Sequence, residues 1–110
     1  MPDAASVREM PATELKAMID RGETFELIDV RTPAEREIGT IPGSRLLDQA
    51  AYDALVQLDP ATPLVFVCHL GQRSRSAAWH FAQLGFEDIR NVSDGIDGWS
   101  AQVDPSVRRY

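Results

Sequence analysis

The chain has 110 residues, of which 44% are hydrophobic and 25% charged, a balance typical of a folded, soluble protein. Its 17 acidic residues outnumber its 11 basic ones, and the resulting net charge of -6 opposes binding to nucleic-acid phosphates. No apolar run approaches the ~18 residues that a membrane span needs. Composition therefore argues against nucleic acid and membrane as partners.

Several further patterns concern the boundaries and the location of the protein. Residues 1–5 have neither the basic flank nor the apolar segment of a secretory signal, so the expected location is the cytoplasm. The single cysteine excludes an intramolecular disulfide. Because there is no internal repeat or linker, residues 1–110 are expected to form one domain, with its core at about 7–102 and a tail at 103–110.

Short β-favouring and helical segments alternate before position 60. Leu15, Met18 and Ile19 recur at helical spacing, which predicts an amphipathic helix that ends near Arg21, before Gly22. The predicted elements of this part are a strand at 7–10, a helix over 13–21, a strand at 25–30, one helical turn at 32–37, a brief apolar stretch at 46–47 and a helix over 48–58.

The same alternation continues after position 60. Residues 64–67 (LVFV) are short, continuous and apolar, which predicts a strand buried on both faces of a parallel sheet. A last strand at 89–92 precedes a turn-rich segment at 93–98, and the pattern as a whole predicts an α/β domain. The helix expected over 74–84 has an apolar stripe of Ala77, Ala78, Phe81, Ala82 and Leu84, with Gly85 as a stop signal.

The only cysteine stands where the central strand gives way to a loop, in the stretch VFVCHLGQRS. Cys68 would lie at the carboxyl end of the strand, Gly71 would let the backbone curl, and Ser74 would lead into the helix. Such a place presents unpaired N–H groups and the positive end of a helix dipole to a bound anion. The dipole and Arg73 are both expected to lower the pKa of the Cys68 thiol from ~8.5.

A lone cysteine is more often a small core residue than a reactive group. An inert core cysteine has no need of a strand end, a glycine-bearing loop and an arginine, so these features favour a reactive Cys68. His69 is expected at the rim of the loop rather than as a base for the thiol, because adjacent loop side chains usually diverge. With two histidines and no ligand-like spacing, no metal site is predicted.

The pattern Cys68-x-x-Gly71-x-Arg73-Ser74, between an apolar strand and a helix, resembles the active-site loop of a rhodanese (sulfurtransferase) domain. Residues 27–35 with 39–44 are similar to the amino-terminal signature of that family, and residues 91–99 occupy the place of its carboxyl-terminal glycine-and-tryptophan signature. The likeness runs from roughly Val7 to Trp99. The tail after Trp99 resembles that of rhodanese domains found beside sulfur-carrier activating modules and glutaredoxin-like modules.

This resemblance implies a central parallel five-stranded sheet flanked by helices on both faces. It also implies that the Cys68 thiolate takes a sulfane sulfur from thiosulfate or a persulfide donor and passes it to a thiophilic acceptor, such as cyanide, a thiol or a protein. No cofactor is implied. The partners are then a small-molecule sulfur donor or a sulfur-relay protein. The substrate-binding residues that the family pattern assigns are His69, Leu70, Gly71, Gln72, Arg73 and Ser74.

Two positions depart from the family pattern, since Thr40 replaces a common histidine and Asp94 the first of two glycines. They put the choice of substrate in doubt more than the activity. Asp29 and Arg31 end a strand beside the predicted site and are expected to support it, with Glu35 as a partner for Arg31.

The remaining aromatic and polar residues have simpler interpretations. Trp79 falls outside the apolar stripe of its helix, either as a contact for a partner protein or packed against a neighbouring loop. Trp99 is expected in the core and His80 on the surface. Residues 94–98 superficially resemble a calcium loop but lack its alternating oxygen ligands, so a turn is expected.

Two other functions compete with sulfur transfer. Related rhodanese-fold phosphatases and arsenate reductases also use a cysteine and an oxyanion-binding loop, but their pattern has five residues between cysteine and arginine. Four residues separate Cys68 from Arg73, and this shorter loop suits a single sulfur atom. The other alternative is a noncatalytic or relay module that carries sulfur or senses redox state through protein contacts.

Overall fold

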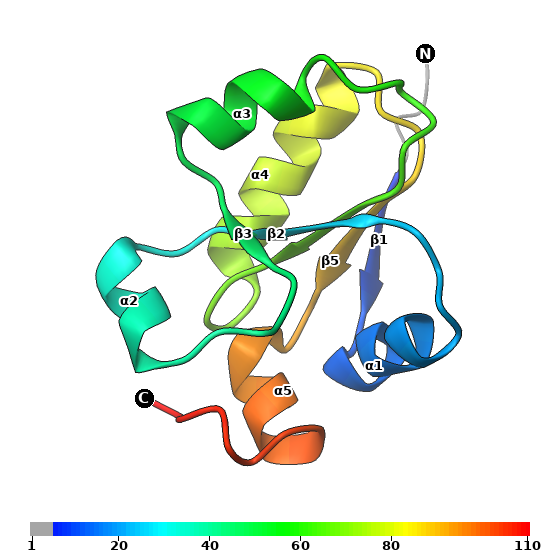
Figure 1. Cartoon of the computed structure of the whole chain (residues 1–110). Helices are drawn as coiled ribbons and strands as arrows, with labels where there is room; N and C mark the ends of the chain where they lie inside the picture. Colours follow the sequence, from blue (N-terminus) through cyan, green and yellow to red (C-terminus); the bar gives the residue numbers. More distant parts are fainter. Residues whose placement is uncertain (1–5) are drawn as a thin grey trace.

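A computed structural model describes residues 6–110 and shows a five-stranded, all-parallel sheet with strand order β1-β5-β4-β2-β3 (Figure 1). The predicted α/β fold is thereby confirmed. The expectation that residues 1–5 carry no secretory signal concerns residues outside this range. The strands are β1 (Val7–Met10), β2 (Glu26–Asp29), β3 (Arg45–Leu46), β4 (Leu64–Val67) and β5 (Ile89–Val92). The helices are α1 (Ala12–Asp20), α2 (Pro33–Ile38), α3 (Gln49–Leu55), α4 (Gln72–Gln83) and α5 (Gly95–Gln102).

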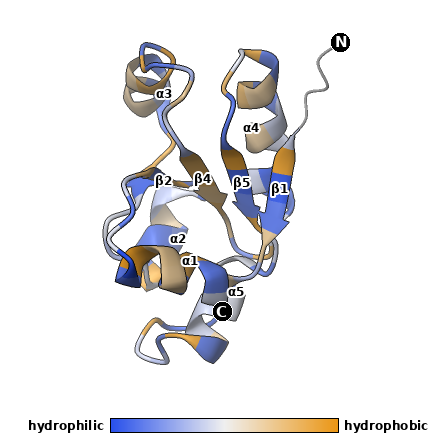
Figure 2. Ribbon diagram, turned by 90° about the vertical axis from the view of Figure 1, so that its right-hand side faces the viewer, coloured by the Kyte–Doolittle hydropathy of each residue, from blue (hydrophilic) through white to orange (hydrophobic). Residues whose placement is uncertain are grey.

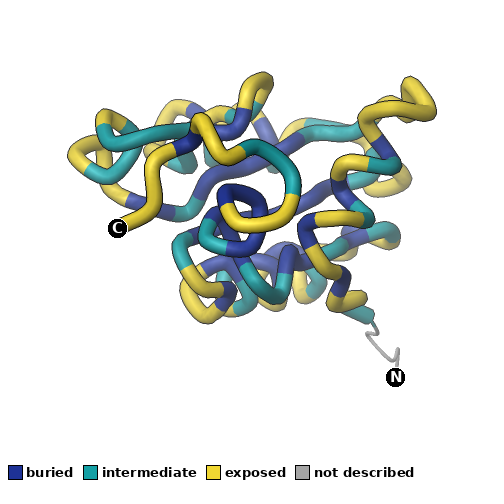
Figure 3. Tube along the Cα trace, turned by 90° about the horizontal axis from the view of Figure 1, so that it is seen from below, coloured by how far each residue is buried: buried dark blue, intermediate teal, exposed yellow. Residues whose placement is uncertain are grey.

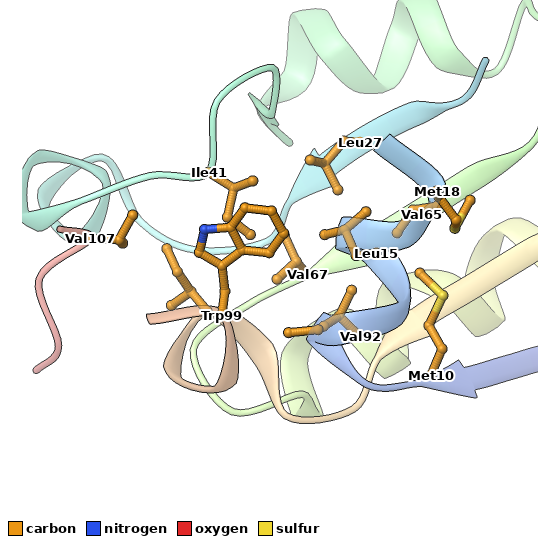
Figure 4. Close-up of a cluster of buried hydrophobic side chains, with 12 residues drawn as sticks. Met10, Leu15, Met18, Leu27, Ile41, Val65, Val67, Val92, Trp99 and Val107 are labelled. Atoms are coloured by element: carbon orange, nitrogen blue, oxygen red, sulfur yellow. The ribbon is translucent and has the colours of Figure 1, made fainter. Parts of the chain in front are cut away.

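Strand β4 lies at the centre of the sheet, and its four residues are all buried, as predicted. Successive strand side chains point to opposite faces, so β4 contributes to a hydrophobic cluster on each side. Val65 and Val67 pack with residues of α1 and α5, among them Trp99 (Figure 4). Leu64 and Phe66 pack with residues of α3 and α4 on the other face. In Figure 2, β4 is coloured as hydrophobic along its length.

Helix α2 is short, and its start is fixed by local chemistry. Pro33 occupies the first turn, where its missing N–H and fixed φ are favourable. The Thr32 hydroxyl accepts from the Glu35 N–H at 3.2 Å, and the Glu35 carboxylate accepts from the Thr32 N–H at 3.0 Å. This reciprocal capping box places the Glu35 carboxylate at the amino end of α2, where it is available to a neighbouring element.

Some sequence-based expectations about elements were wrong. The segment at 93–98 is not only a turn, because α5 begins at Gly95; burial of Ile96 and Trp99 overrides the weak helix propensity of its glycines. Leu84 is 46% exposed because α4 ends at Gln83, before Leu84 can join the apolar stripe. Helix α3 stops at Leu55 rather than 58, and the apolar stretch at 46–47 overlaps a short strand, β3, at Leu46.

Within residues 6–110, no helix has both the length and the hydrophobicity that crossing a lipid bilayer requires.

Candidate active site

Cys68 follows β4 directly, and residues 68–71 form the connection to α4. Its side chain is completely buried, with an exposed fraction of 0%. Gly71 directly precedes α4 with a φ of 103°, and a Cβ at this position would collide with the carbonyl oxygen of Ser93. Only glycine tolerates both the positive φ and the close contact with Ser93, and it lets the backbone turn tightly around the sulfur.

Helix α5 fixes the direction of the loop backbone. The Ile96 N–H donates to the Cys68 carbonyl at 2.8 Å, and the Asp97 N–H donates to the His69 carbonyl at 3.2 Å. Gly95 has a φ of 62°, and a Cβ on it would collide with the same two carbonyls. Because the loop carbonyls are occupied by α5, the amides of the loop are free to face the sulfur.

The Cys68 sulfur accepts hydrogen bonds from the loop. The Gly71 N–H lies 3.1 Å from Sγ, and the Ser74 hydroxyl oxygen lies 3.2 Å from it. Burial raises the pKa of the Cys68 thiol, but the Ser74 hydroxyl and the amides of Ser74, Gly71 and Leu70 together lower the pKa below its ordinary value. The direction agrees with the sequence prediction. The donors that produce it are neutral groups rather than Arg73.

Arg73 is bound to Glu35 of α2 instead. Its Nη1 and Nη2 donate to the two carboxylate oxygens at 2.7 and 2.9 Å, a bidentate pair. The Arg73 hydrogen bonds hold the pKa of Glu35 well below its usual range. The side chain of Arg73 therefore ties the first turn of α4 to α2. Sequence reasoning missed this pairing.

Asp29 and Arg31 form a buried ion pair beside the site. Arg31 Nη2 and Nε donate to the Asp29 carboxylate at 2.8 and 2.9 Å, and Arg36 Nη1 adds a third contact at 2.8 Å. Burial lowers the pKa of Arg31, but the hydrogen bonds to Asp29 and Tyr110, together with the charges of these groups, raise it above its ordinary value. The expected side-chain pair between Arg31 and Glu35 was wrong, because Arg31 donates to the Glu35 backbone carbonyl at 3.2 Å.

The tail packs against the same loop. The Tyr110 ring stacks on the His69 imidazole with a centroid separation of 3.9 Å, and its hydroxyl donates to the Glu35 carboxylate at 2.7 Å. Arg109 pairs with Asp97 at 3.0 Å. Val107 is the one buried position in an otherwise exposed stretch of the tail, and Figure 3 shows this stretch crossing the molecule. No sequence signal pointed to Tyr110, because nothing local links it to the loop.

A second set of residues that sequence reasoning missed surrounds Ser74. The Ser74 hydroxyl oxygen lies 2.5 Å from Oδ1 of Asn91, which is buried in β5. Asn91 Nδ2 donates to Glu9 of β1 at 2.9 Å. An asparagine between the arginine and the valine of a predicted buried strand is the one signal in the sequence that could have indicated this cluster.

The other predicted site residues lie at the edge of the loop. Leu70 is 50% exposed, and Gln72 is exposed in the first turn of α4. His69 is half-buried, and its ring stacks on that of Tyr110. The loop amides of Leu70, Gly71 and Ser74 are thus the groups that the structure brings around the sulfur.

The residues with simpler interpretations lie away from the sulfur. Trp79 is 42% exposed on the outer side of α4, Trp99 is in the core, and His80 is exposed and bound to the Tyr52 hydroxyl. Asp94, which departs from the family pattern, accepts from the Ala12 N–H at 2.8 Å and so caps the start of α1. This departure has a structural role.

The sequence over residues 11–102 matches the family model described as a rhodanese-like domain. The chain belongs to the rhodanese-like family. It is 37% identical over 75 residues to the thiosulfate sulfurtransferase GlpE of Pseudomonas paraeruginosa, a match that covers 67% of this chain and 68% of GlpE. It is 31% identical over 110 residues to a probable adenylyltransferase/sulfurtransferase MoeZ of Mycobacterium tuberculosis, covering 97% of this chain and 28% of MoeZ.

Among solved structures, the chain is similar to a rhodanese-like domain protein from Staphylococcus aureus. The TM-score is 0.75 at 25% sequence identity, and the match covers 94% of this chain and 99% of that protein. The resemblance seen in the sequence is therefore confirmed in both family and fold. Sulfurtransferases among the relatives support this class of enzyme at the level of the family.

Proposed function

We propose that this protein is a sulfurtransferase in which Cys68 is the nucleophile and carries the transferred sulfur as a persulfide. The observation that carries the proposal is the set of neutral donors on Sγ: the Gly71 amide at 3.1 Å and the Ser74 hydroxyl at 3.2 Å. These donors favour a thiolate, and the neighbouring loop amides favour the negative charge of a terminal persulfide sulfur.

The reaction consists of two displacements at sulfur. In the first, the Cys68 thiolate attacks the sulfane sulfur of thiosulfate; the Sγ–S bond forms, and the S–S bond of thiosulfate breaks with its electron pair leaving on sulfite. In the second, a nucleophile such as cyanide or a thiolate attacks the outer sulfur. Thiocyanate or a new persulfide leaves, and the Cys68 thiolate is restored. No cofactor takes part.

Arg73 has a supporting role in this proposal. Its guanidinium is engaged by the Glu35 carboxylate, which directs it toward α2. The pair fixes the start of α4, whose first amides belong to the cradle around the sulfur. Asp29 and Arg31 hold the adjacent end of β2 in the same way, without contacting the sulfur.

A second candidate differs only in the partner. The match to MoeZ covers nearly the whole chain, tail included, although it represents 28% of MoeZ. This favours a relay in which the sulfur comes from, or goes to, another protein rather than a small molecule. The phosphatase alternative has less support, because four residues separate Cys68 from Arg73 and Arg73 is turned toward Glu35.

Intact-protein mass spectrometry tests the proposal. Incubation with thiosulfate is expected to add the mass of one sulfur atom, cyanide is expected to remove it as thiocyanate, and Cys68→Ser is expected to abolish both. Ser100→Ala, a buried substitution on α5, serves as the control and should load normally. An unchanged mass together with hydrolysis of an aryl phosphate would favour the phosphatase. An unchanged mass with thiosulfate but loading from a persulfidated protein would favour the relay.

A further inference from the structure

The Ser74 hydroxyl has one proton and two side-chain acceptors that compete for it. Its oxygen lies 3.2 Å from Cys68 Sγ and 2.5 Å from Asn91 Oδ1. The Gly71 backbone carbonyl, 3.3 Å away, is a third acceptor, and it already accepts from Asn91 Nδ2. All three side chains are buried, so water cannot replace a missing partner. A hydroxyl donates one hydrogen bond at a time and accepts up to two. The direction of the Ser74 proton therefore affects both Cys68 and Asn91.

The orientation of the Asn91 amide is fixed by its own donors. Nδ2 donates to a Glu9 carboxylate oxygen at 2.9 Å and to the Gly71 carbonyl at 3.1 Å, and both of these groups only accept. Glu9 is held in turn by Arg75 Nε at 2.8 Å. Oδ1 must consequently face Ser74, and it has no proton to offer.

The network is fully satisfied when Cys68 is a thiol. The S–H then donates to the Ser74 oxygen, and the Ser74 hydroxyl donates to Asn91 Oδ1. When Cys68 is a thiolate, the single Ser74 hydroxyl proton can be donated either to the sulfur or to Asn91 Oδ1, but not to both. If it turns to the sulfur, Asn91 Oδ1 is left buried without a donor; if it stays with Asn91, the thiolate lacks one of its donors.

We propose that Asn91 is a positioning residue that competes with the Cys68 thiolate for the Ser74 proton and so keeps the thiolate incompletely stabilised. The inference rests on the proposed function, because a less stabilised thiolate is the better nucleophile toward a sulfur donor. When the persulfide forms, the charge moves to the outer sulfur and Sγ no longer needs the proton. Ser74 then returns to Asn91, which favours the loaded state.

The test substitutes none of the other ionisable groups around the site, although Asn91→Ala also removes a donor to Glu9. Arg73 and Arg75 both interact electrostatically with Cys68, and each is paired with a carboxylate. The charged and titratable groups that surround the loop are Arg73 and Arg75 of α4, Glu9 of β1, Glu35 of α2, Asp97 of α5, His69 of the loop and Tyr110 of the tail.

A double-mutant cycle of Asn91→Ala, Ser74→Ala and the double variant tests the competition. The pKa of Cys68 is measured from the pH dependence of its alkylation by iodoacetamide, which needs no sulfur donor. Asn91→Ala is expected to lower this pKa, raising the thiolate fraction about threefold to tenfold at a pH below both values, because Ser74 can then serve the sulfur alone. In the Ser74→Ala background, the same substitution is expected to change little.

Several outcomes would overturn the proposal. An equal shift of the Cys68 pKa with Ser74 present and in the Ser74→Ala background would show that Asn91 acts only by holding the loop. A higher Cys68 pKa in Asn91→Ala would be a shift opposite to the one proposed. Ser100→Ala is the control for a buried substitution and should leave the pKa unchanged. Because alkylation is independent of sulfur transfer, a failure of the proposed function would appear only in the thiosulfate experiment.

A measurement on the unsubstituted protein covers the case in which Asn91→Ala does not fold. The side-chain carbonyl carbon of Asn91 should show a change of NMR chemical shift with the same midpoint as Cβ of Cys68, because the Ser74 hydroxyl proton that is donated to its oxygen moves when the thiol ionises. A carbonyl shift that stays constant through the Cys68 titration would contradict the inference.

Discussion

The groups that donate hydrogen bonds to Cys68 carry no formal charge. The Cys68 sulfur accepts hydrogen bonds from the Gly71 amide and the Ser74 hydroxyl. The nearby Arg73 is paired with Glu35. Fixed dipoles in a buried site act without the reorganisation that a mobile charged side chain would need. The sulfur is therefore stabilised by the backbone geometry of the loop, which a substitution at its edge would not remove.

The lowered pKa of Cys68 makes stability depend on pH in a definite direction. Because the folded protein has the lower pKa, its thiolate contributes stability that is fully present above the unfolded value of ~8.5 and is lost as pH falls through the folded value. Urea unfolding of the protein and of Cys68→Ser should therefore show a stability difference that grows in favour of Cys68 as the pH rises. A difference that stays constant, or that grows as the pH falls, would contradict the lowered pKa.

The sequence predicted the position of Cys68 at the strand end and the loop around it, but not their long-range partners. Cys68, Gly71 and Ser74 belong to one contiguous motif, so local spacing was sufficient. Glu35 meets Arg73 from 38 positions away in the sequence, and Tyr110 meets Glu35 from 75 positions away. Such pairs depend on how separate elements pack, and one sequence contains no local pattern that specifies them.

At the scale of elements, the contact between α5 and the loop is the one that orients the site. The first amides of α5 bind the carbonyls of Cys68 and His69, and Gly95 lies directly against both. The sequence alone suggested a turn here, since its glycines are typical of turns and only the packed core shows why they begin a helix. Gly95 also permits the close approach of α5 to the loop carbonyls.

Gly95→Ala is expected to destabilise the fold and to abolish sulfur loading, because a methyl group would push the loop carbonyls away from α5. Gly85→Ala is the matched control: it also has a positive φ, 105°, but open space around it. The control should cost about 1 kcal/mol and load normally. Urea unfolding and mass spectrometry measure the two effects. Equal losses in both variants would show that backbone strain, not contact with the loop, is responsible.

At the scale of the whole molecule, parallel strand order brings distant parts of the chain to one edge of the sheet. The alternation of strands and helices was enough to predict this architecture. The buried Asp29 carboxylate joins β2 to Arg31 and to Arg36 of α2, and Arg31 also contacts the Gly39 carbonyl and the Tyr110 hydroxyl. Asp29 and Arg31 together thus connect β2, α2 and the tail.

Asp29→Ala is expected to reduce the free energy of unfolding by roughly 3–5 kcal/mol, because it leaves the buried Arg31 guanidinium without its carboxylate. Asp20→Ala removes the exposed ion pair with Lys16 and should cost less than about 1 kcal/mol. Chemical denaturation of both variants provides the comparison. Similar losses would mean that the buried pair contributes no more than a surface pair.

The complete burial of Cys68 also affects whether two copies of the protein can form a disulfide. A disulfide between two copies requires two sulfur atoms to approach to about 2.05 Å. The only cysteine of this chain has an exposed fraction of 0%, so the loop keeps the sulfur of a second copy at a distance. Air oxidation therefore has no easy route to a covalent dimer.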